Sequence, residues 1–469
     1  METLEIISDI ISILFLIYSV FFVIHMLSGY LIAFNRFDMM KSKKFSIETF
    51  VDNEVTKEHY ISLIVPAYNE SDCISDTIES LLNDEYPYIN IYIVDDGSND
   101  DMSSMLINNY KFEPCDIKYD NIIPTQDVKR TYHQDINGKK IFLIVKNNGG
   151  KSDAINCGLN FSKDPHCLIV DADTQVESGS IRILLSEFLK NPKTIAAGGA
   201  IGNRNKSKKH HKKLSIFQKA LVYFQRLEYY RTFYANRILL DKINANSIMS
   251  GAFTMFDTEI LKKISGFKVK TIGEDMEITM RLHAFFSANK TDYNIAYVPE
   301  ARCNTEFPFY YKDFKSQRIR WHIGLIQSLK SHFYMIGNVN YSWIGVITGA
   351  VTIVYEVLSP FIEVFGILFL LFMYKYHYGN TFLIIKMILL FILFMFMQQI
   401  VLIAAIKSYE IEEISFKEQL IIAFISLLEI FIFHPYNIVI KLIAIFRMKK
   451  KESSWGHITR IKKQNNTSV

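Results

Sequence analysis

Long apolar stretches at both ends of the chain constrain its fold more than any other feature of the sequence. Of the 469 residues, 49% are hydrophobic, and they are concentrated in a few long runs, whereas the middle of the chain has the charge and turn content of a soluble α/β domain. A helix crosses a bilayer with about 20 consecutive apolar residues. The sequence therefore predicts a membrane protein with a water-soluble domain between its membrane segments.

The first apolar stretch, residues 6–33, predicts a transmembrane helix. It is too long for the core of a signal peptide, and no small-residue cleavage site follows it. Acidic residues precede the stretch and basic residues follow it, beginning with Arg36. The positive-inside rule then places the amino terminus outside and everything from Asn35 onward in the cytoplasm. Residues 34–59 are polar and predict a cytosolic linker.

Three apolar stretches near the end of the chain predict further membrane segments. They lie at residues 343–373, 382–406 and 417–447. If the third were a full span, the basic tail at 448–469 would lie outside, against the positive-inside rule. We therefore expect this segment to be broken at Pro435, with its second half at the cytoplasmic interface.

Charge and cysteine content exclude several functional classes. The net charge is +4, so the overall balance indicates no polyanionic partner and no nucleic acid. Basic runs at 206–213 and 447–451 could lie against the anionic headgroups of membrane lipids, although the first fits a solvated loop equally well. The five cysteines lack Cys-x-x-Cys spacing, which argues against a disulfide framework or a zinc site and fits reduced thiols.

The soluble part begins with a strand–helix–strand pattern. An apolar strand leads into Pro66-Ala67-Tyr68-Asn69-Glu70, a helix is expected at about 71–83, and a second strand at 89–94 ends in Asp95-Asp96-Gly97-Ser98. This spacing is typical of a βαβ unit in an open α/β sheet. Such sheets bind ligands at the carboxyl ends of their strands.

A glycine-rich loop follows a less regular region. Residues 99–139 are polar and weakly patterned, and we interpret them as a helix plus a surface insertion. A strand at 141–145 then leads into Asn147-Asn148-Gly149-Gly150-Lys151-Ser152 and a helix. The loop is not a Walker phosphate loop, because the required earlier glycine would fall at Val145. Lys151 could still face a diphosphate from a glycine-rich loop that opens a helix.

Two carboxylates end the next strand, Leu168-Ile169-Val170-Asp171-Ala172-Asp173. The apolar run predicts a buried parallel strand whose carboxyl end contributes to the site. Mg²⁺ and Mn²⁺ take oxygen ligands, commonly one or two carboxylates plus substrate phosphates. Asp171 and Asp173 are therefore candidate metal ligands. An acidic turn after a strand is the alternative that these residues alone leave open.

Later residues could complete such a site. Ser250-Gly251 precedes Glu274-Asp275, an acidic pair that opens a helix expected at 276–286, where a carboxylate is also a common cap. Further on, Gln317, Arg320 and Trp321 would share one face of a helix just before the membrane stretch. The alternative for this last group is an interfacial anchor. The aromatic helix expected at 215–237 fits a packed core or an interfacial face better than a sugar platform.

Five motifs thus stand in one order: Pro66-x-Tyr68-Asn69-Glu70, Asp95-Asp96-Gly97-Ser98, Asp171-x-Asp173, Glu274-Asp275 and Gln317-x-x-Arg320-Trp321. The set resembles the processive family 2 glycosyltransferases, inverting membrane synthases of poly-N-acetylglucosamine, hyaluronan, chitin and cellulose. The resemblance covers about residues 58–465. It includes Trp455-Gly456-x-x-Thr459-Arg460, which looks like the gating loop of hyaluronan-type synthases with looser spacing.

The resemblance implies a GT-A fold over residues 60–335 and a role for each motif. The residues that would hold the uridine are Pro66, Ala67, Tyr68, Glu70, Asp95 and Asp96. Lys151 and Asp171 would contact the nucleotide, and Asp173, with Asp171 beside it, would hold Mg²⁺ or Mn²⁺. Asp275, next to Glu274, would be the general base. The residues that would seat the acceptor sugar and the diphosphate are Ser250, Gly251, Gln317, Arg318, Arg320 and Trp321. Trp455 and Arg460 would close over the donor.

The resemblance also implies a multi-pass enzyme of the plasma membrane with a cytoplasmic catalytic domain. Its partners would be a UDP-sugar donor, a growing polysaccharide, membrane lipids and a small accessory membrane subunit. UDP-N-acetylglucosamine is the favoured donor, because the short membrane complement looks most like that of the poly-N-acetylglucosamine synthases. Hyaluronan-, cellulose- and other glucan-type products stay open.

Two other hypotheses compete with a processive synthase. A non-processive enzyme that glycosylates a lipid is one, although single-transfer relatives commonly lack Gln317-x-x-Arg320-Trp321. An inactive transport or assembly subunit is the other. Against it, no expected carboxylate is missing from the sequence.

Overall fold

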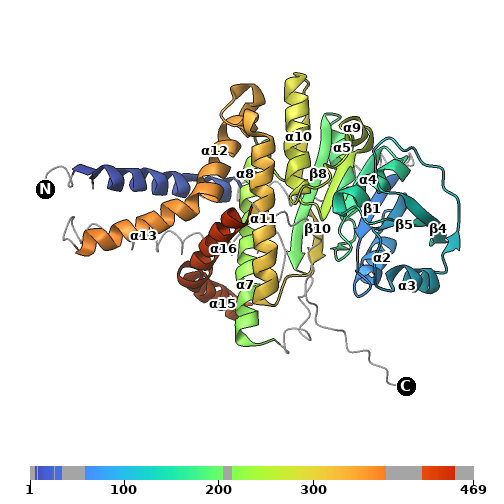
Figure 1. Ribbon diagram of the computed structural model, residues 1–469, viewed down its shortest axis with the longest axis horizontal. Helices are drawn as coiled ribbons and strands as arrows, with labels where there is room; N and C mark the ends of the chain where they lie inside the picture. The colour runs from blue at the N-terminus through green and yellow to red at the C-terminus, as the bar shows by residue number, and fades with distance from the viewer. Residues whose placement is uncertain are drawn as a thin grey trace.

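The computed structural model describes residues 6–7, 9–25, 27–33, 59–203, 214–375 and 415–448. Several predicted segments lie outside the described residues. They are the linker up to residue 58, the basic run 206–213, the apolar stretch 382–406, and the tail with Trp455 and Arg460. Figure 1 shows a sheet domain at one end of the molecule and a group of long helices at the other.

A mixed sheet forms the centre of the described part and joins ten strands in the order β3-β4-β5-β2-β1-β6-β9-β8-β10-β7. The strands are β1 (Ile61–Ala67), β2 (Ile89–Asp95), β3 (Glu113–Pro114), β4 (Val128–Ile136), β5 (Lys139–Lys146), β6 (His166–Val170), β7 (Gln175–Val176), β8 (Thr194–Asn203), β9 (Phe253–Asp257) and β10 (Asn294–Thr305). β5, β2, β1 and β6 run parallel, and β9 runs antiparallel to both β6 and β8. The predicted βαβ unit at the start of the domain is confirmed.

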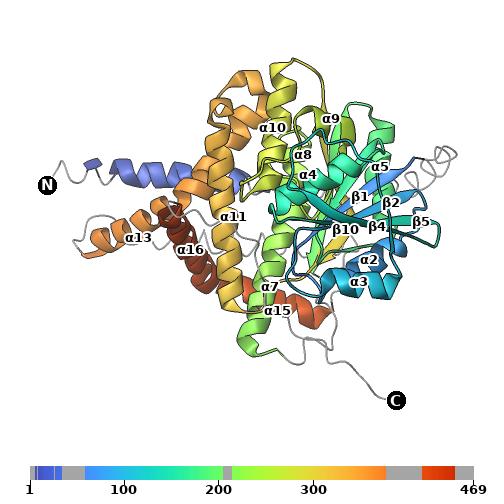
Figure 2. The same ribbon diagram turned by 45° about the vertical axis from the view of Figure 1, so that its right-hand side comes forward.

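Helices flank the sheet on both sides (Figures 1 and 2). Those of the sheet domain are α2 (Ile74–Leu82), α3 (Met102–Tyr110), α4 (Lys151–Phe161), α5 (Ser180–Lys190), α9 (Thr258–Lys263) and α10 (Glu274–Ala288). Every residue of β1 is buried, as its apolar sequence predicts, and α4 packs on β1 and β2. The hydrophobic core lies between these layers and fixes the edge at which the strands end.

The interpretation of residues 99–139 as a helix plus a surface insertion is incomplete. α3 occupies the first part, but residues 128–136 form β4, which pairs antiparallel with β5. A two-residue turn joins them, with φ of 53° at Asn137 and 78° at Gly138. Asn-Gly suits a hairpin turn in which both residues have positive φ. This dipeptide was the sequence signal that would have predicted the hairpin.

The second part of the molecule is helical. Its elements are α7 (Ile216–Arg231), the π-helical turn η2 (Thr232–Asn236), α8 (Arg237–Asp241), α11 (Tyr311–Ser331), η3 (Phe333–Met335), η4 (Val339–Tyr341), η5 (Ile344–Thr348), α12 (Gly349–Thr352), η6 (Ile353–Leu358), α13 (Ser359–Lys375), α15 (Phe416–Leu428), η7 (Glu429–Phe433) and α16 (His434–Arg447). α7 and α11 run side by side in both views. α16 packs on α11 and α13, and α15 packs on α7, so these helices join the sheet domain to the apolar end.

Two helices of the described part are long and apolar enough to cross a membrane, Asp9–Ala33 and Ile344–Phe372. They extend from the same end of the molecule (Figure 1). At the predicted break, the π-helical turn η7 comes directly before α16, and Pro435 lies in the first turn of α16. The chain changes direction there (Figure 2). The position of α16 relative to a membrane stays a prediction.

Candidate active site

The predicted nucleotide and metal motifs lie at one edge of the sheet. Ala67 at the end of β1 pairs with Asp95 at the end of β2, and β6 runs parallel to β1 on its other side. Parallel strands deliver the loops that follow them to the same edge. Tyr68, Glu70 and the turn at 171–173 accordingly line one cavity.

α2 holds the turn that contains Asp171 and Asp173. The Thr77 hydroxyl donates a hydrogen bond to the Ala172 carbonyl oxygen at 2.7 Å, and the Cys73 thiol donates to the same oxygen at 3.5 Å. Thr77 is fully buried on the same face of α2 as the apolar residues. Sequence analysis missed it, although a threonine within the apolar stripe of an amphipathic helix is a recognisable sign of an internal hydrogen bond.

The loop after β1 depends on Asn69, whose φ of 56° is in the left-handed region that asparagine tolerates. The Asn69 backbone N–H donates to Ser98 Oγ at 2.9 Å, and the backbone N–H of Asn99 donates to Asn69 Oδ1 at 2.7 Å. This loop carries Tyr68 and Glu70, which line the cavity together with Pro66. Their contact with a nucleotide stays a prediction.

Asp95 and Asp96 are placed differently from the other predicted nucleotide residues. Both are buried, and, like Ala67, they lie outside the lining of the cavity formed by the described residues. Asp95 accepts hydrogen bonds from the Ser98 backbone N–H at 2.8 Å and from the Ser103 hydroxyl. In the described structure these two carboxylates shape the loops around the site.

Asp96, Lys146 and Asp153 form an ion cluster inside the domain, here called the inner cluster. Lys146 Nζ lies 2.6 Å from Asp96 Oδ1 and 2.5 Å from Asp153 Oδ1. The backbone N–H of Gly150 donates to Asp96 Oδ2 at 2.7 Å. A Cβ on Gly149 would lie 2.4 Å from the Asp153 side chain, so only glycine fits there. The cluster thereby holds the glycine-rich loop in its path toward Lys151.

Lys151, Asp171 and Glu274 form a second ion cluster at the cavity, here called the outer cluster. Lys151 Nζ lies 2.7 Å from Asp171 Oδ1 and 2.9 Å from Glu274 Oε1. Burial by itself would lower the pKa of Lys151, but the charges of Asp171 and Glu274 raise it well above its usual value. Burial raises the pKa of Asp171 to about 6, with the charge of Asp173 acting in the same direction and that of Lys151 opposing it. Lys151 thus joins the end of β6 to the start of α10.

Asp275 lies in the first turn of α10 and lines the same cavity. The backbone N–H of Gly251 donates to Asp275 Oδ2 at 3.4 Å, which brings the predicted Ser250-Gly251 loop next to this carboxylate. Burial raises the pKa of Asp275 to about 6, the charge of Glu274 raises it further, and Lys151 opposes both. A carboxylate with a pKa near 6 is ionised at neutral pH and is a stronger base than an ordinary aspartate.

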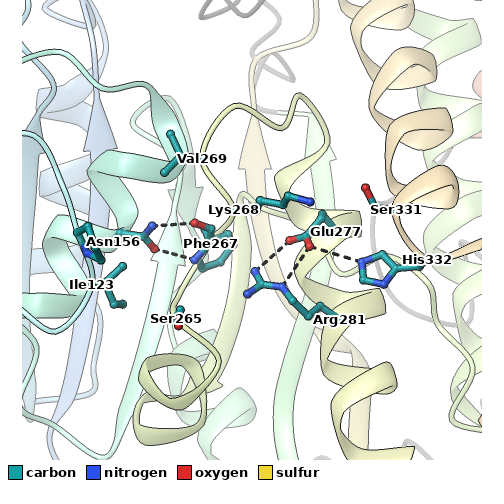
Figure 3. A pocket seen from close by; sticks show the side chains of 11 residues that line it. Ile123, Asn156, Ser265, Phe267, Lys268, Val269, Glu277, Arg281, Ser331 and His332 are labelled. Carbon is teal, nitrogen blue, oxygen red and sulfur yellow. Dashed lines mark hydrogen bonds and ion pairs between the residues drawn. The ribbon is translucent and has the colours of Figure 1, made fainter. Parts of the chain in front are cut away.

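Hydrogen bonds and ion pairs around a second pocket fix the position of α10 (Figure 3). Glu277, half a turn after Asp275, accepts hydrogen bonds from Arg281 Nε at 3.1 Å and Nη2 at 3.0 Å, and it lies 3.4 Å from His332 Nε2. The loop before α10 is held by Asn156, whose side chain bonds both the N–H and the carbonyl of Phe267 at 2.7 Å. These residues line a separate pocket of about 510 Å³.

Gln317, Arg320 and Trp321 all lie on α11 and line the large cavity, as predicted from their helical spacing. Trp321 is 45% exposed. Arg318, also predicted to bind the acceptor or the diphosphate, pairs with Glu228 of α7 at 2.9 Å and lies over the Trp321 ring at 4.3 Å. Arg318 therefore holds Trp321 in place and ties α11 to α7.

The large cavity has a volume of about 1520 Å³ and extends well beyond the strand ends. Its lining begins with Lys151 and Asp173, passes Asp275 and Trp321, and continues to Phe15, Tyr18, Gly366 and Leu370 of the two apolar helices. A single space thus connects the candidate site with the apolar end of the molecule.

The candidate metal ligands at the cavity are the carboxylates of Asp171 and Asp173. The described residues contain no group of three or more His, Cys, Asp or Glu side chains that could hold a metal. Asp171 and Asp173 line the cavity together, one residue apart in the turn after β6. This arrangement fits Mg²⁺ or Mn²⁺ that completes its coordination with phosphate oxygens.

Comparison with known sequences shows that the predicted motifs of the site lie within the match to one family model. The model of the family described as "Glycosyltransferase like family 2" matches residues 59–324, which include every predicted motif from Pro66 to Trp321. The chain is 28% identical over 319 residues to the poly-beta-1,6-N-acetyl-D-glucosamine synthase of Staphylococcus epidermidis, and 26% identical over 319 residues to that of Staphylococcus aureus (strain MSSA476). Each alignment covers 68% of this chain and 66% of the relative, just under two thirds of its length.

Two solved structures are similar in arrangement. The mannosyltransferase PcManGT from Pyrobaculum calidifontis, in complex with GDP-Man and Mn²⁺, matches with a TM-score of 0.48 at 14% identity, over 90% of this chain and 99% of that one. S. aureus TarS 1-349 in complex with UDP-GlcNAc matches with a TM-score of 0.34 at 14% identity, over 64% of this chain and 78% of that one.

Proposed function

Because the chain belongs to the glycosyltransferase like family 2, we propose that it is an inverting, processive membrane enzyme that polymerises a UDP-sugar. The proposed donor is UDP-N-acetylglucosamine, and the proposed product is an extracellular β-linked polysaccharide. The names of the staphylococcal relatives support this choice. In this proposal the catalytic domain lies in the cytoplasm and the apolar helices cross the plasma membrane.

The observation that carries the proposal is the continuity of the large cavity. One lining contains Lys151 and Asp171 at the strand ends, Asp275 and Trp321 in the middle, and Phe15 at the apolar end. An enzyme that releases a small product needs no path between its active site and its membrane helices. A polymerase that feeds its product across the membrane does need such a path.

The proposed chemistry is direct displacement at the anomeric carbon of the donor sugar. Asp275 takes the proton from the acceptor hydroxyl as that oxygen attacks, and its raised pKa suits a general base. On the opposite side, Lys151 and Arg320 offset the negative charge that develops on the departing nucleoside diphosphate. Trp321 offers its exposed ring to the acceptor sugar.

Asp173 and Asp171 are the residues that would hold the divalent cation. When bound, Mg²⁺ or Mn²⁺ supplies positive charge to the diphosphate of the donor. Thr77 and Cys73 keep the backbone between the two carboxylates in place. Asp171 Oδ1 is ion-paired with Lys151, and Asp173 Oδ1 accepts a hydrogen bond from the Thr305 hydroxyl at 3.3 Å, so both carboxylates are held at the lining of the cavity.

The charges near the apolar end of the cavity favour an uncharged polymer. Three ion pairs lie there, Arg318–Glu228, Arg231–Glu429 and Lys441–Glu356. A path whose charges cancel in pairs suits a neutral sugar chain better than a polyanion such as hyaluronan.

The proposal is tested with purified full-length protein in lipid vesicles, Mg²⁺ or Mn²⁺, and labelled UDP-N-acetylglucosamine, UDP-glucose and UDP-glucuronic acid. We expect polymer from UDP-N-acetylglucosamine alone, identified by linkage-specific digestion. Asp275→Asn should lower turnover by about 10²–10⁴-fold, since it removes the base. Binding of UDP should be unchanged in this variant, because the base does not contact the nucleotide.

Other outcomes would contradict the proposal in distinct ways. Polymer that requires UDP-glucuronic acid as well would indicate a hyaluronan-type enzyme. A lipid that carries a single sugar would indicate a non-processive transferase. Failure of every donor would indicate an inactive assembly subunit, and full activity of Asp275→Asn would remove the assigned base.

A further inference from the structure

Arg237 lines the large cavity but belongs to none of the motifs identified in the sequence. It begins α8 directly after the π-helical turn η2, and it is 7% exposed. π-helical turns are rare and often occur at functional sites, because the extra residue shifts side chains from their regular helical positions. A local irregularity of the helix therefore sets the position of Arg237.

The guanidinium of Arg237 lacks partners that its burial would require. Among the described residues, neither Nε nor Nη1 has a hydrogen-bond partner, and the group lies 4.5 Å from the Phe233 ring centroid and 5.8 Å from that of Tyr297. Two other arginines of the cavity, Arg231 and Arg318, each pair with a glutamate. Buried donors are nearly always satisfied, and an unpaired one costs free energy. A ligand that enters the cavity can supply the missing acceptor.

Electrostatic coupling indicates which part of the cavity Arg237 serves. Burial and the charge of Glu274 raise the pKa of Asp275, and Lys151 and Arg237 lower it, so Arg237 acts on the proposed base. For Arg320, burial lowers the pKa, and the charges that oppose this are those of Glu274 and Asp171. Lys151 is ion-paired with the same two carboxylates. Lys151 is thus held between two carboxylates, whereas Arg237 has no ion pair among the described residues and lines the same cavity as Asp275.

We propose that Arg237 binds the acceptor sugar, donating hydrogen bonds to hydroxyl or carbonyl oxygens next to the hydroxyl that Asp275 deprotonates. The inference rests on the proposed function, because it requires a saccharide acceptor. A guanidinium has donors and no acceptor, so its ligand must offer oxygen lone pairs, as sugar hydroxyls and acetamido groups do. Arg237 holds the acceptor, and Asp275 moves the proton.

The test measures acceptor binding and nucleotide binding separately in the full-length protein. Calorimetric titration with a short N-acetylglucosamine oligosaccharide, in the presence of UDP, should show affinity about tenfold weaker or more for Arg237→Gln, because hydrogen bonds to a charged group are lost. Titration with UDP alone should give the wild-type affinity. Arg237→Lys should recover part of the oligosaccharide affinity, since lysine keeps the positive charge but lacks the planar guanidinium with its several hydrogen-bond donors.

Thermal unfolding provides the matched control. Arg237→Gln should keep or raise the apparent melting temperature, because it removes a buried guanidinium whose Nε and Nη1 have no hydrogen-bond partner among the described residues. Arg231→Gln should lower it, because it leaves Glu429 unpaired. A lower melting temperature for Arg237→Gln with unchanged oligosaccharide affinity would show a structural role and overturn the inference.

Two further results would also overturn the inference. Loss of UDP affinity in Arg237→Gln would assign the guanidinium to the diphosphate. Equal oligosaccharide affinity in wild type and variant would show that Arg237 does not contact the acceptor. If the wild-type protein bound UDP but no oligosaccharide, the proposed polysaccharide function itself would be contradicted. This result is distinct from the two above, because it is seen in the wild-type protein and does not depend on the Arg237→Gln variant.

Discussion

The inner and outer clusters have the same composition, one lysine between two carboxylates, but different surroundings. In the inner cluster the side chains of Lys146, Asp96 and Asp153 are 0%, 0% and 5% exposed. In the outer cluster those of Lys151, Asp171 and Glu274 are 25%, 30% and 12% exposed. The two lysines are five positions apart in the chain, and α4 begins at the second.

Because the two clusters differ in exposure, we expect the buried inner cluster to have a structural role and the partly exposed outer cluster to have a functional role. Inside the domain, an ion pair cannot exchange partners, because water cannot replace a lost contact. At the cavity, Lys151 can leave Asp171 or Glu274 for the phosphates of a ligand, since these side chains line the space that the ligand would enter. We therefore expect the inner cluster to determine stability and the outer cluster to determine activity.

The largest expected effect is on stability, from Lys146→Met. The substitution leaves two buried carboxylates without their cation, which costs about 3–5 kcal/mol. The apparent melting temperature, followed by circular dichroism in detergent, should fall by on the order of 10 °C. Adding Asp96→Asn and Asp153→Asn should recover part of the loss. An unchanged melting temperature for Lys146→Met alone would contradict the structural role of the inner cluster.

Lys151→Met should affect activity and leave stability nearly intact. Loss of a cation that offsets charge on the leaving diphosphate should lower kcat/KM for the UDP-sugar by about 10²–10³-fold. The free energy of unfolding should fall by less than for Lys146→Met, because the side chains of the outer cluster are partly exposed at the cavity. Steady-state kinetics and thermal unfolding of one preparation measure both quantities. A large loss of stability with normal kinetics would reverse the assignment of the two clusters.

The smallest expected effect is the dependence of turnover on pH. A base must be deprotonated to act, and the pKa of Asp275 is about 6, raised by burial and Glu274 and opposed by Lys151 and Arg237. At saturating donor, kcat should therefore fall by about tenfold per pH unit once the pH is below the pKa of Asp275 in the donor complex. Saturating donor matters because Asp171 has a similar pKa and affects donor binding. A flat profile down to pH 5 would contradict the role of Asp275.

The sequence predicted the positions of motifs whose residues lie at the ends of strands and helices. Asp171 and Asp173 follow a strand, Asp275 opens a helix, and the faces of α11 follow from 3.6-residue periodicity. Local backbone geometry determines such positions, and the roles of these residues were implied by the resemblance of the five ordered motifs to the family 2 glycosyltransferases. The β4–β5 hairpin was predictable in the same way from Asn137-Gly138 and was missed only because its strand is polar.

Tertiary structure decided which charged and polar residues meet across long separations. Thr77 reaches Ala172, Lys151 reaches Glu274, and Arg237 remains without a hydrogen-bond partner at Nε and Nη1 among the described residues. The sheet order and the packing of the helices decide these contacts, and no local pattern encodes either. The sequence determined the chemistry at the strand ends, because local geometry suffices there. The fold alone determined that Lys146 is enclosed in the domain and that Lys151 lines the cavity, because burial depends on residues distant in the chain.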